Sequence, residues 1–444
     1  MSDDLRTRMH HVADEITPLP VSDDLWRRGQ AARHRAQALA VAAVLVVLAS
    51  VGGGAALWST SDREARTASG EVPGGGAIPS RIVDVPADLD VTTDLAVGRG
   101  SAAFISRDRE PVVITAADGV AHRLELAGWA SDADAPGTTR LNQALALSPD
   151  GARLAWQGAD DESGRATINV LDLATGDAST YRPLPPDEGL RLREMSWSPD
   201  SSWLAWIADA PPTAWVGRLR PGPEPDSQAH RVRANVPDVA VDTLGTLVHG
   251  SAAGGLERIR STGDTSPLTP GKDVDVTSLG AGRFSPDGRY LALRSSLDPV
   301  SYTFDTEDRK LLEHPFPDGT FEDGFVMPQG WLDDRLQLLL VQESSAPDRA
   351  ELVVTTPRVG ATSTWRRAVA VVDAGPAASL SLAVDLIPDL DGTSSQELTH
   401  DFDDPAEDPP TPLGIELSLF IGLSVAAAIA LLLALRWLWR RVLS

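Results

Sequence analysis

The stretch FSPDGRYLAL at residues 284–293 occurs twice more in related form, as LSPDGARLAW at 147–156 and as WSPDSSWLAW at 197–206. In SPDG, proline and aspartate suit the two central positions of a tight turn. Glycine can take the positive φ with which the chain re-enters a strand. The expected turn residues are Pro149, Asp150, Gly151, Pro199, Asp200, Pro286, Asp287 and Gly288. Ser201 replaces glycine in the second copy, which leaves the shape of that turn open.

The run after each turn is apolar on both faces of the expected strand, which is typical of a strand between two other layers. One alanine recurs in the three runs, as Ala155, Ala205 and Ala292. We expect these alanines to mark the side on which the neighbouring layer comes closest.

The spacing of the copies indicates a tandem repeat. Asp150 and Asp200 are 50 residues apart, and Asp287 follows 87 residues later, close to two periods of about 43 residues. Weaker copies lie at residues 95–105, 241–250 and 331–341. A second hairpin follows several copies, at 112–126, 168–183 and 302–314, so each unit holds about four strands.

Four strands per unit, repeated in tandem, predict an all-β protein, a β-propeller of about six four-stranded blades. Seven blades are the alternative, because residues 81–85 and 379–387 could either close the ring or begin a partial seventh blade. A β-sandwich is a further alternative, which three near-identical decamers at related spacings disfavour.

Two uncharged segments, 38–58 and 417–435, are each about long enough to cross a bilayer as a helix. Arginines precede the first segment and end the second, so the positive-inside rule places both termini in the cytoplasm and residues 59–413 outside it. A cleaved signal peptide is the alternative for the first segment.

The expected domain order follows from these segments. It is a cytoplasmic leader with a short amphipathic helix (1–36), a transmembrane helix (37–58), a flexible linker (59–80), the extracytoplasmic propeller (81–388), an acidic Pro-rich linker (389–414), a second transmembrane helix (415–438) and a cytoplasmic tail (439–444).

The three decamers resemble the WD-like propeller repeat of the TolB type, over about residues 90–375 and strongly in three blades. The flanking apolar segments are similar to those of membrane-anchored propeller proteins of actinobacteria. The resemblance implies a ring of about six blades with a binding role and no catalytic residue.

Composition excludes several functions. The chain has 63 acidic and 39 basic residues and a formal net charge of −24, which argues against nucleic acid as a partner. It has no cysteine, so disulfides, thiolate nucleophiles and Cys-based metal sites are absent. Lysine occurs only at 272 and 310. We interpret the excess of arginine as coding bias and give individual arginines little functional weight.

No motif carries a catalytic or metal site. The chain has no G-x-S-x-G nucleophile elbow. The sequence DLDGTSSQE at 389–397 has Ile387 and Leu398 at the first and last ligand positions of a calcium loop, so an Asp-Gly turn explains it better. The exported histidines lack paired zinc spacing, namely His122, His230, His249, His314 and His400. We therefore predict no cofactor and no metal, although a propeller can gather residues of different blades at its central channel.

The tryptophans of the repeats are expected to fill the core between blades, namely Trp156, Trp197, Trp206 and Trp331. Trp203 is the exception. It alternates with Leu204 beside the abnormal turn, so we expect it to be exposed.

Three functions remain open. The leading hypothesis is a non-enzymatic membrane-anchored module of the cell envelope that binds an unknown protein, peptide or glycan. The second is an enzyme in the axial channel, which clustered carboxylates and histidines there would favour. The third is a regulator that acts on a cytosolic factor through the leader. The first rests on fold analogy.

Overall fold

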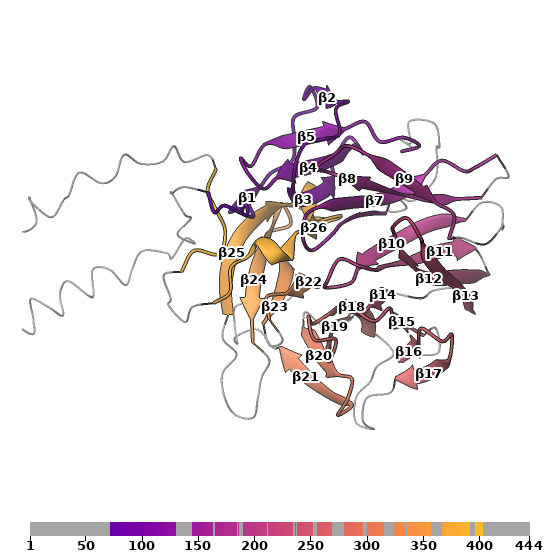
Figure 1. Ribbon diagram of the computed structural model, residues 1–444. Helices are drawn as coiled ribbons and strands as arrows, with labels where there is room; N and C mark the ends of the chain where they lie inside the picture. The colour runs from indigo at the N-terminus through magenta and orange to yellow at the C-terminus, as the bar shows by residue number, and fades with distance from the viewer. Residues whose placement is uncertain are drawn as a thin grey trace, which may run out of the picture. The chain divides into compact units, whose positions relative to one another are not determined.

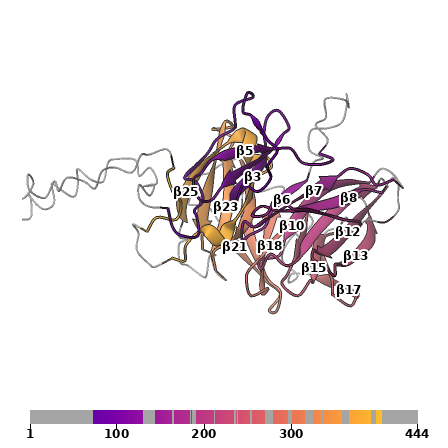
Figure 2. The same cartoon turned by 45° about the horizontal axis from the view of Figure 1, so that its top comes forward.

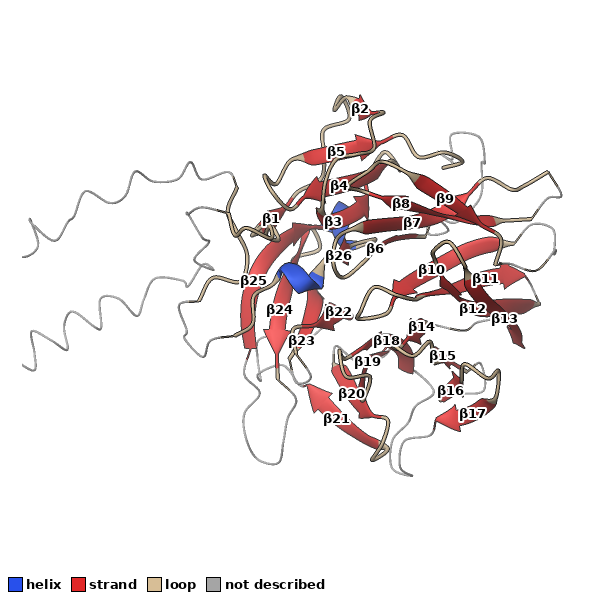
Figure 3. Cartoon of the chain, viewed as in Figure 1, coloured by secondary structure: helices blue, strands red, loops and turns tan. Residues whose placement is uncertain are grey.

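The computed structural model describes residues 72–129, 144–162, 165–183, 185, 190–210, 212–233, 236, 238–251, 255–268, 279–295, 300–314, 324–333, 336–356, 366–390 and 396–402. Within these residues, β-strands form six sheets (Figures 1 and 3). Four of these sheets have four strands and two have five. Four strands of each sheet, in radial order, form one blade, and we number the blades from the chain start. This confirms the predicted six-bladed, four-stranded β-propeller.

In the first half of the ring, every blade has an inner strand, two middle strands and an outer strand. From the axis outward, blade 1 contains β26 (Ser381–Leu382), β3 (Gly100–Ile105), β4 (Pro111–Thr115) and β5 (Ala121–Leu124). Blade 2 contains β6 (Leu145–Leu147), β7 (Arg153–Gly158), β8 (Thr167–Asp172) and β9 (Ala178–Tyr181). Blade 3 contains β10 (Arg191–Trp197), β11 (Leu204–Ala210), β12 (Thr213–Arg220) and β13 (Asp226–Arg233).

The second half of the ring has the same order. Blade 4 contains β14 (Val239–Val241), β15 (Leu247–Gly250), β16 (Leu256–Ile259) and β17 (Thr265–Leu268). Blade 5 contains β18 (Leu279–Phe284), β19 (Tyr290–Ser295), β20 (Ser301–Asp305) and β21 (Lys310–His314). Blade 6 contains β22 (Gly324–Trp331), β23 (Gln337–Glu343), β24 (Arg349–Thr355) and β25 (Arg366–Asp373).

The innermost strands of successive blades contact one another around a central axis (Figure 2). Both ends of the described chain close this ring. Strand β26 pairs antiparallel with β3 and supplies the inner strand of blade 1. Strand β1 (Arg81–Ile82) pairs with β25 at the outer edge of blade 6, and β2 (Val91–Thr92) pairs with β5 in blade 1. Residues 81–85 and 379–387 thus close six blades and do not begin a seventh.

The SPDG corners share one hydrogen-bond pattern. In blade 5 the Ser285 hydroxyl donates to Asp287 Oδ1 at 2.6 Å and accepts from the Tyr290 amide at 2.9 Å. Gly151 and Gly288 have φ values of 71° and 74°, and Ser201 takes a φ of 58°. Ser201 therefore keeps the shape of a turn that the sequence left open.

Two linker boundaries differ from the prediction, because residues assigned to the tethers pack onto the ring. Ala77 and Ile78 are buried, and Pro79 forms a β-bridge with His400. Leu398, Thr399 and His400 are buried as well. The folded unit thus begins before residue 81 and extends past residue 388.

No helix in the described part of the chain is long and apolar enough to cross a membrane. Both predicted membrane spans, the leader and the tail lie outside the described residues.

Candidate functional site

Two cavities lie on the axis of the ring. The larger, which we call the axial chamber, has a volume of about 740 Å³ and is lined by residues of all six blades, near the start of the innermost strands. The smaller, the turn pocket, has a volume of about 90 Å³ and lies where inner strands run into the turns. Met195 and Arg283 line both cavities. The segment leading into β26 and η2 (Val384–Leu386) also contributes to both.

Irregular pairing in three inner strands places polar side chains on the axis. The register shifts at Arg193 in β10, at Gly282 in β18 and at Gln329 in β22. An extra residue of this kind bends a strand and re-aims the neighbouring side chains. Arg193 and Glu194 consequently both line the chamber, although neighbours in a regular strand face opposite sides.

Two arginines of the chamber are neutralised by carboxylates. Arg193 Nε lies 3.2 Å from Asp209 Oδ2, and Arg294 Nη2 lies 3.5 Å from Asp238 Oδ1. Asp238 is buried. These pairs leave Glu194 and Arg283 as the chamber's other inner charged groups. Arg107 and Arg109 lie at its rim, where Arg107 Nε pairs with Asp84 Oδ2 at 3.3 Å.

Glu194 has an unusual protonation equilibrium. Burial, reinforced by the neighbouring Asp238 carboxylate, raises the pKa of Glu194 to about 8, while Arg283, Arg294 and Arg193 act in the opposite direction. Burial also raises the pKa of Asp238. Glu194 is therefore mostly protonated at neutral pH and contributes little negative charge to the chamber.

Arg283 is the inner arginine without a carboxylate partner. Within the described residues its guanidinium makes a single hydrogen bond, from Nη1 to its neighbour's Gly282 carbonyl oxygen at 3.0 Å, and no ion pair. Burial lowers the pKa of Arg283, and Glu194 and Asp238 oppose that shift. The guanidinium nevertheless stays charged, because arginine is not deprotonated in proteins.

The repeat alignment shows that Arg283 is exceptional. It lies two residues before Ser285, the serine of the SPDG turn, in the inner strand of blade 5. The corresponding residues of four other blades are small: Ala146, Ser196, Ala240 and Gly330. Small residues suffice for this position in the ring, so packing alone does not call for an arginine.

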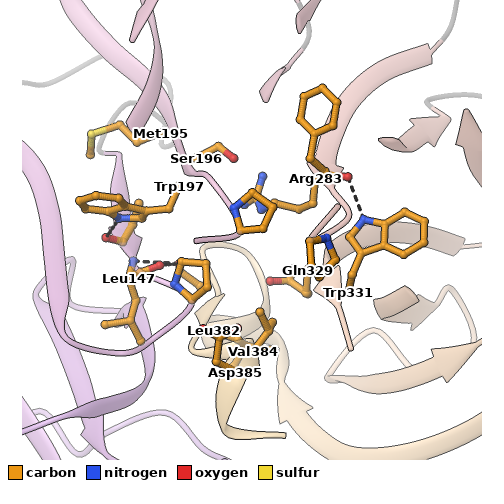
Figure 4. A pocket seen from close by; sticks show the side chains of 17 residues that line it. Leu147, Met195, Ser196, Trp197, Arg283, Gln329, Trp331, Leu382, Val384 and Asp385 are labelled. Carbon is orange, nitrogen blue, oxygen red and sulfur yellow. Dashed lines mark hydrogen bonds between the residues drawn. The ribbon is translucent and has the colours of Figure 1, made fainter. Parts of the chain in front are cut away.

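The turn pocket has aromatic walls and unused polar groups (Figure 4). Trp197 and Trp331 stand on opposite sides, and their indole N–H groups donate to the carbonyl oxygens of Ala146 at 3.0 Å and Arg283 at 2.9 Å. Ser196 and Gln329 are 1% and 5% exposed. Neither the Ser196 hydroxyl nor the Gln329 amide nitrogen has a hydrogen-bond partner among the described residues.

The predicted turn residues lie around this pocket. Pro149, Pro199 and Pro286 line it. The corners of blades 2 and 3 also bond to each other, because the Asp150 amide donates to Ser201 Oγ at 3.2 Å. The turns thus contribute both to the corners of single blades and to contacts between blades.

The three repeated alanines, Ala155, Ala205 and Ala292, are fully buried. Ala155 packs with residues of blade 3, and Ala205 packs with Val239, Val241 and Leu247 of blade 4.

The expectation that Trp203 is exposed is wrong. Trp203 is 7% exposed and packs in the cluster that joins blades 3 and 4. The Arg218 guanidinium covers its ring at 4.7 Å from the centroid, and Gly245 of blade 4 leaves it room. The other repeat tryptophans are buried as predicted: Trp156, Trp197, Trp206 and Trp331.

The histidines lie apart from the axis. His249, His314 and His400 are buried, His122 and His230 are partly buried, and none of the five lines either cavity. Among the residues that the structure describes, no three His, Asp or Glu side chains are grouped to hold a metal ion. The Asp-Gly turn at residues 391–392 lies outside the described residues.

Sequence reasoning missed the charged residues of the chamber, namely Arg193, Glu194, Asp238, Arg283 and Arg294. They were missed because the excess of arginine was interpreted as coding bias. One signal was available, because aligning the decamers with their preceding residues places Arg283 opposite Ala146 and Ser196.

No family model matches the chain, and no curated protein matches it significantly. Solved structures similar to it include TolB from Acinetobacter baumannii, with 17% identity over 64% of this chain and 68% of that one and a TM-score of 0.38. Putative TolB from Agrobacterium tumefaciens has 14% identity, coverages of 64% and 96% and a TM-score of 0.37. The Cps50 (Swd1) β-propeller domain of Myceliophteria thermophila has 11% identity, coverages of 53% and 73% and a TM-score of 0.34. These similarities concern the fold alone.

Proposed function

We propose that this chain is a non-enzymatic binding module of the cell envelope, anchored by its two apolar segments, and that its propeller receives part of a protein, peptide or glycan in the axial channel. The observation that carries the proposal is the chamber of about 740 Å³ lined from all six blades. Ligand sites typically have volumes of roughly 300–1,000 Å³ and combine apolar walls with a few polar groups.

The composition of the chamber supports binding over chemistry. Its two inner carboxyl groups stand among arginines, and among the described residues no histidine lines it. Asp238 is held by Arg294 at 3.5 Å. Such compensated charges fix the orientation of a ligand without supplying a nucleophile and its base.

Site-specific photo-crosslinking in the native host tests the binding site. A photoreactive residue at position 378, which is exposed and lines the chamber, should give a crosslinked product. Position 178, exposed on the outermost strand of blade 2, is the matched control. Identical products at both positions, or none at 378, would contradict an axial binding site.

The absence of cysteine makes the envelope location testable. An Ala178→Cys variant should react with a membrane-impermeant maleimide in intact cells, whereas Ser2→Cys should react only after lysis. The reverse pattern would place the propeller in the cytoplasm.

The pair Glu194 and Asp238 favours one second candidate, an enzyme of the axial channel. A carboxylic acid with a pKa near 8 beside a carboxylate is suited to act as an acid and base pair. Identification of the ligand that co-purifies with the wild-type chain and with a Glu194→Gln variant distinguishes a binding module from an enzyme. Binding predicts the same molecule from both, and catalysis predicts converted ligand from the wild-type chain alone.

A further inference from the structure

We propose that the axial channel is an oxyanion site, in which Arg283 binds a carboxylate or phosphate group of a small ligand. This inference rests on the proposed axial binding site and names the chemistry of its ligand. The chain has a formal net charge of −24, which disfavours anion binding to the protein as a whole. Anion binding in the channel therefore depends on the charged groups that line it.

Charge distinguishes Arg283 from the neighbouring arginines of the chamber. Arg193 and Arg294 each have a carboxylate partner within 3.5 Å, in Asp209 and Asp238. Arg283 has no ion pair within the described residues, although it reaches into both cavities. Glu194 and Asp238 act on Arg283 only without direct contact. A partly buried guanidinium that lacks a direct ion pair is costly, and an anionic ligand relieves that cost.

Arg283 also departs from the repeat. Four blades use alanine, serine or glycine where blade 5 uses arginine. An arginine that replaces these small residues adds five N–H donors to the axis. The planar guanidinium fork matches the two oxygens of a carboxylate or phosphate.

Two polar groups without hydrogen-bond partners lie in the turn pocket with Arg283. Ser196 Oγ and Gln329 Nε2 are buried without partners in the described part of the chain, and both residues line the turn pocket together with Arg283 (Figure 4). A hydroxyl and an amide nitrogen both donate hydrogen bonds. The pocket of about 90 Å³ has room for the oxygens of one acidic group, and the chamber can hold the remainder of the ligand.

Ionisable groups around Arg283 give the site a pH dependence. Glu194, Asp238, Arg193 and Arg294 face it in the chamber, and the exposed Asp385 lies across the turn pocket. Glu194 is largely neutral below its pKa of about 8 and becomes a carboxylate above it. Anion binding should therefore weaken as the pH rises from 7 to 9.

Calorimetric titration of the purified full chain with succinate and with sulfate tests the site. Both probes stay fully ionised over this pH range. Succinate reports on carboxylates, and sulfate stands for a tetrahedral phosphate-type anion. We expect at least one to bind with a Kd of roughly 1 mM or below. The probe that binds shows whether the site takes a carboxylate or a phosphate-type anion.

The decisive variant is Arg283→Ser, which installs the residue that blade 3 carries at the same position. This variant should fold with an unchanged or raised melting temperature. It should bind the probe roughly tenfold to hundredfold more weakly, because one pair of charge-assisted hydrogen bonds is lost. Arg182→Gln, at an exposed ion pair with Asp161, is the matched control and should bind normally. Glu194→Gln removes the titrating group, so its probe binding should no longer weaken between pH 7 and pH 9.

Two results would overturn the inference: neither probe binds the folded wild-type chain, or Arg283→Ser binds as tightly as the wild type. Both leave the photo-crosslinking result at position 378 unaffected, so the chemistry of the ligand can fail while the axial site stands. Loss of position-specific crosslinking would instead remove the proposed function.

Discussion

Serine and glycine of the SPDG turns carry much of the local geometry. The buried Ser285 hydroxyl accepts the Tyr290 amide proton and donates to Asp287, so it closes the corner from inside. Glycine at the fourth position supplies a positive φ, as at Gly151 and Gly288. Similar turns nevertheless stand in different surroundings, because the preceding blade comes closer to Gly151 than to Gly288.

Two glycines with nearly the same φ give a matched prediction. A Cβ at Gly288 would meet only Asp242 Cβ at 3.7 Å, so Gly288→Ala should cost about 1 kcal/mol of unfolding free energy, from the left-handed backbone. A Cβ at Gly151 would lie 2.1 Å from the Gly100 carbonyl oxygen in blade 1. Gly151→Ala should cost about 1–3 kcal/mol more, from overpacking. Equal losses in denaturant unfolding would contradict the close contact between blades 1 and 2.

His314 makes stability depend on pH. It is 1% exposed, and its Nε2 lies 2.6 Å from Thr303 Oγ1. Burial lowers the pKa of His314 to about 3 from an ordinary value of 6.5. Below pH 6.5, His314 therefore binds a proton in the unfolded chain but stays neutral in the folded chain. The stabilisation is complete above pH 6.5 and is lost as the pH falls toward 3.

His314→Gln keeps an amide within reach of Thr303 and cannot titrate. We expect wild type to lose on the order of a few kcal/mol relative to this variant between pH 7 and pH 4. Thermal unfolding over this range measures the difference, in which carboxylates common to both proteins cancel. Parallel pH profiles would show that His314 is not held neutral.

The blades, as elements, meet through small residues on their second strands. Ala205 of β11 contacts the apolar residues Val239, Val241 and Leu247 of blade 4. Both faces of β11 are covered, since Leu204, Ala205 and Trp206 are all fully buried. Gly217 of β12 makes this possible, because a Cβ there would lie 2.2 Å from Trp206.

Ala205→Trp should prevent the close approach of blades 3 and 4. The added ring has no space, so the variant should lose at least about 1–3 kcal/mol or fail to fold. Ala178→Trp adds the same ring on the exposed outer strand of blade 2 and should melt like the parent. A normal melting temperature for Ala205→Trp would contradict the assignment of this face.

At the scale of the whole molecule, closure of the ring depends on two short pairings between distant parts of the chain. Ser381 and Leu382 pair with Ala103 and Ala102, and Arg81 pairs with Val371. The Ser381 hydroxyl also accepts the Leu147 amide at 2.9 Å, which ties blade 1 to blade 2. One large apolar cluster joins blades 6, 1 and 2 at this seam.

Leu382→Asp should open the seam, because it places a charge at a position that is 4% exposed. Hydrogen exchange should speed up roughly tenfold or more in β3 and β26, while β11 and β12 in blade 3 keep their protection. Ser227→Asp, at an exposed site of β13, is the control and should change neither region. Uniform loss of protection around the ring would show that the blades do not open separately.

The sequence predicted the parts of the fold that depend on neighbours along the chain. Turn chemistry and hydrophobic runs located the corners and the buried strands, and their spacing indicated about six blades. Contacts between distant segments were not predictable in this way. Trp203 is buried because Arg218 and Gly245 cover it, and Ile78 is buried in a segment whose composition is that of a linker.

The sequence by itself thus determined the repeating four-stranded blade and a number of about six, because such a unit is specified by local turns and alternating apolar positions. Only the tertiary structure decided which strands close the ring and which charges meet on its axis. Arg193, Asp238 and Arg283 come from three blades and meet only at the chamber. Their pairing depends on distances across space, which no spacing along the chain encodes.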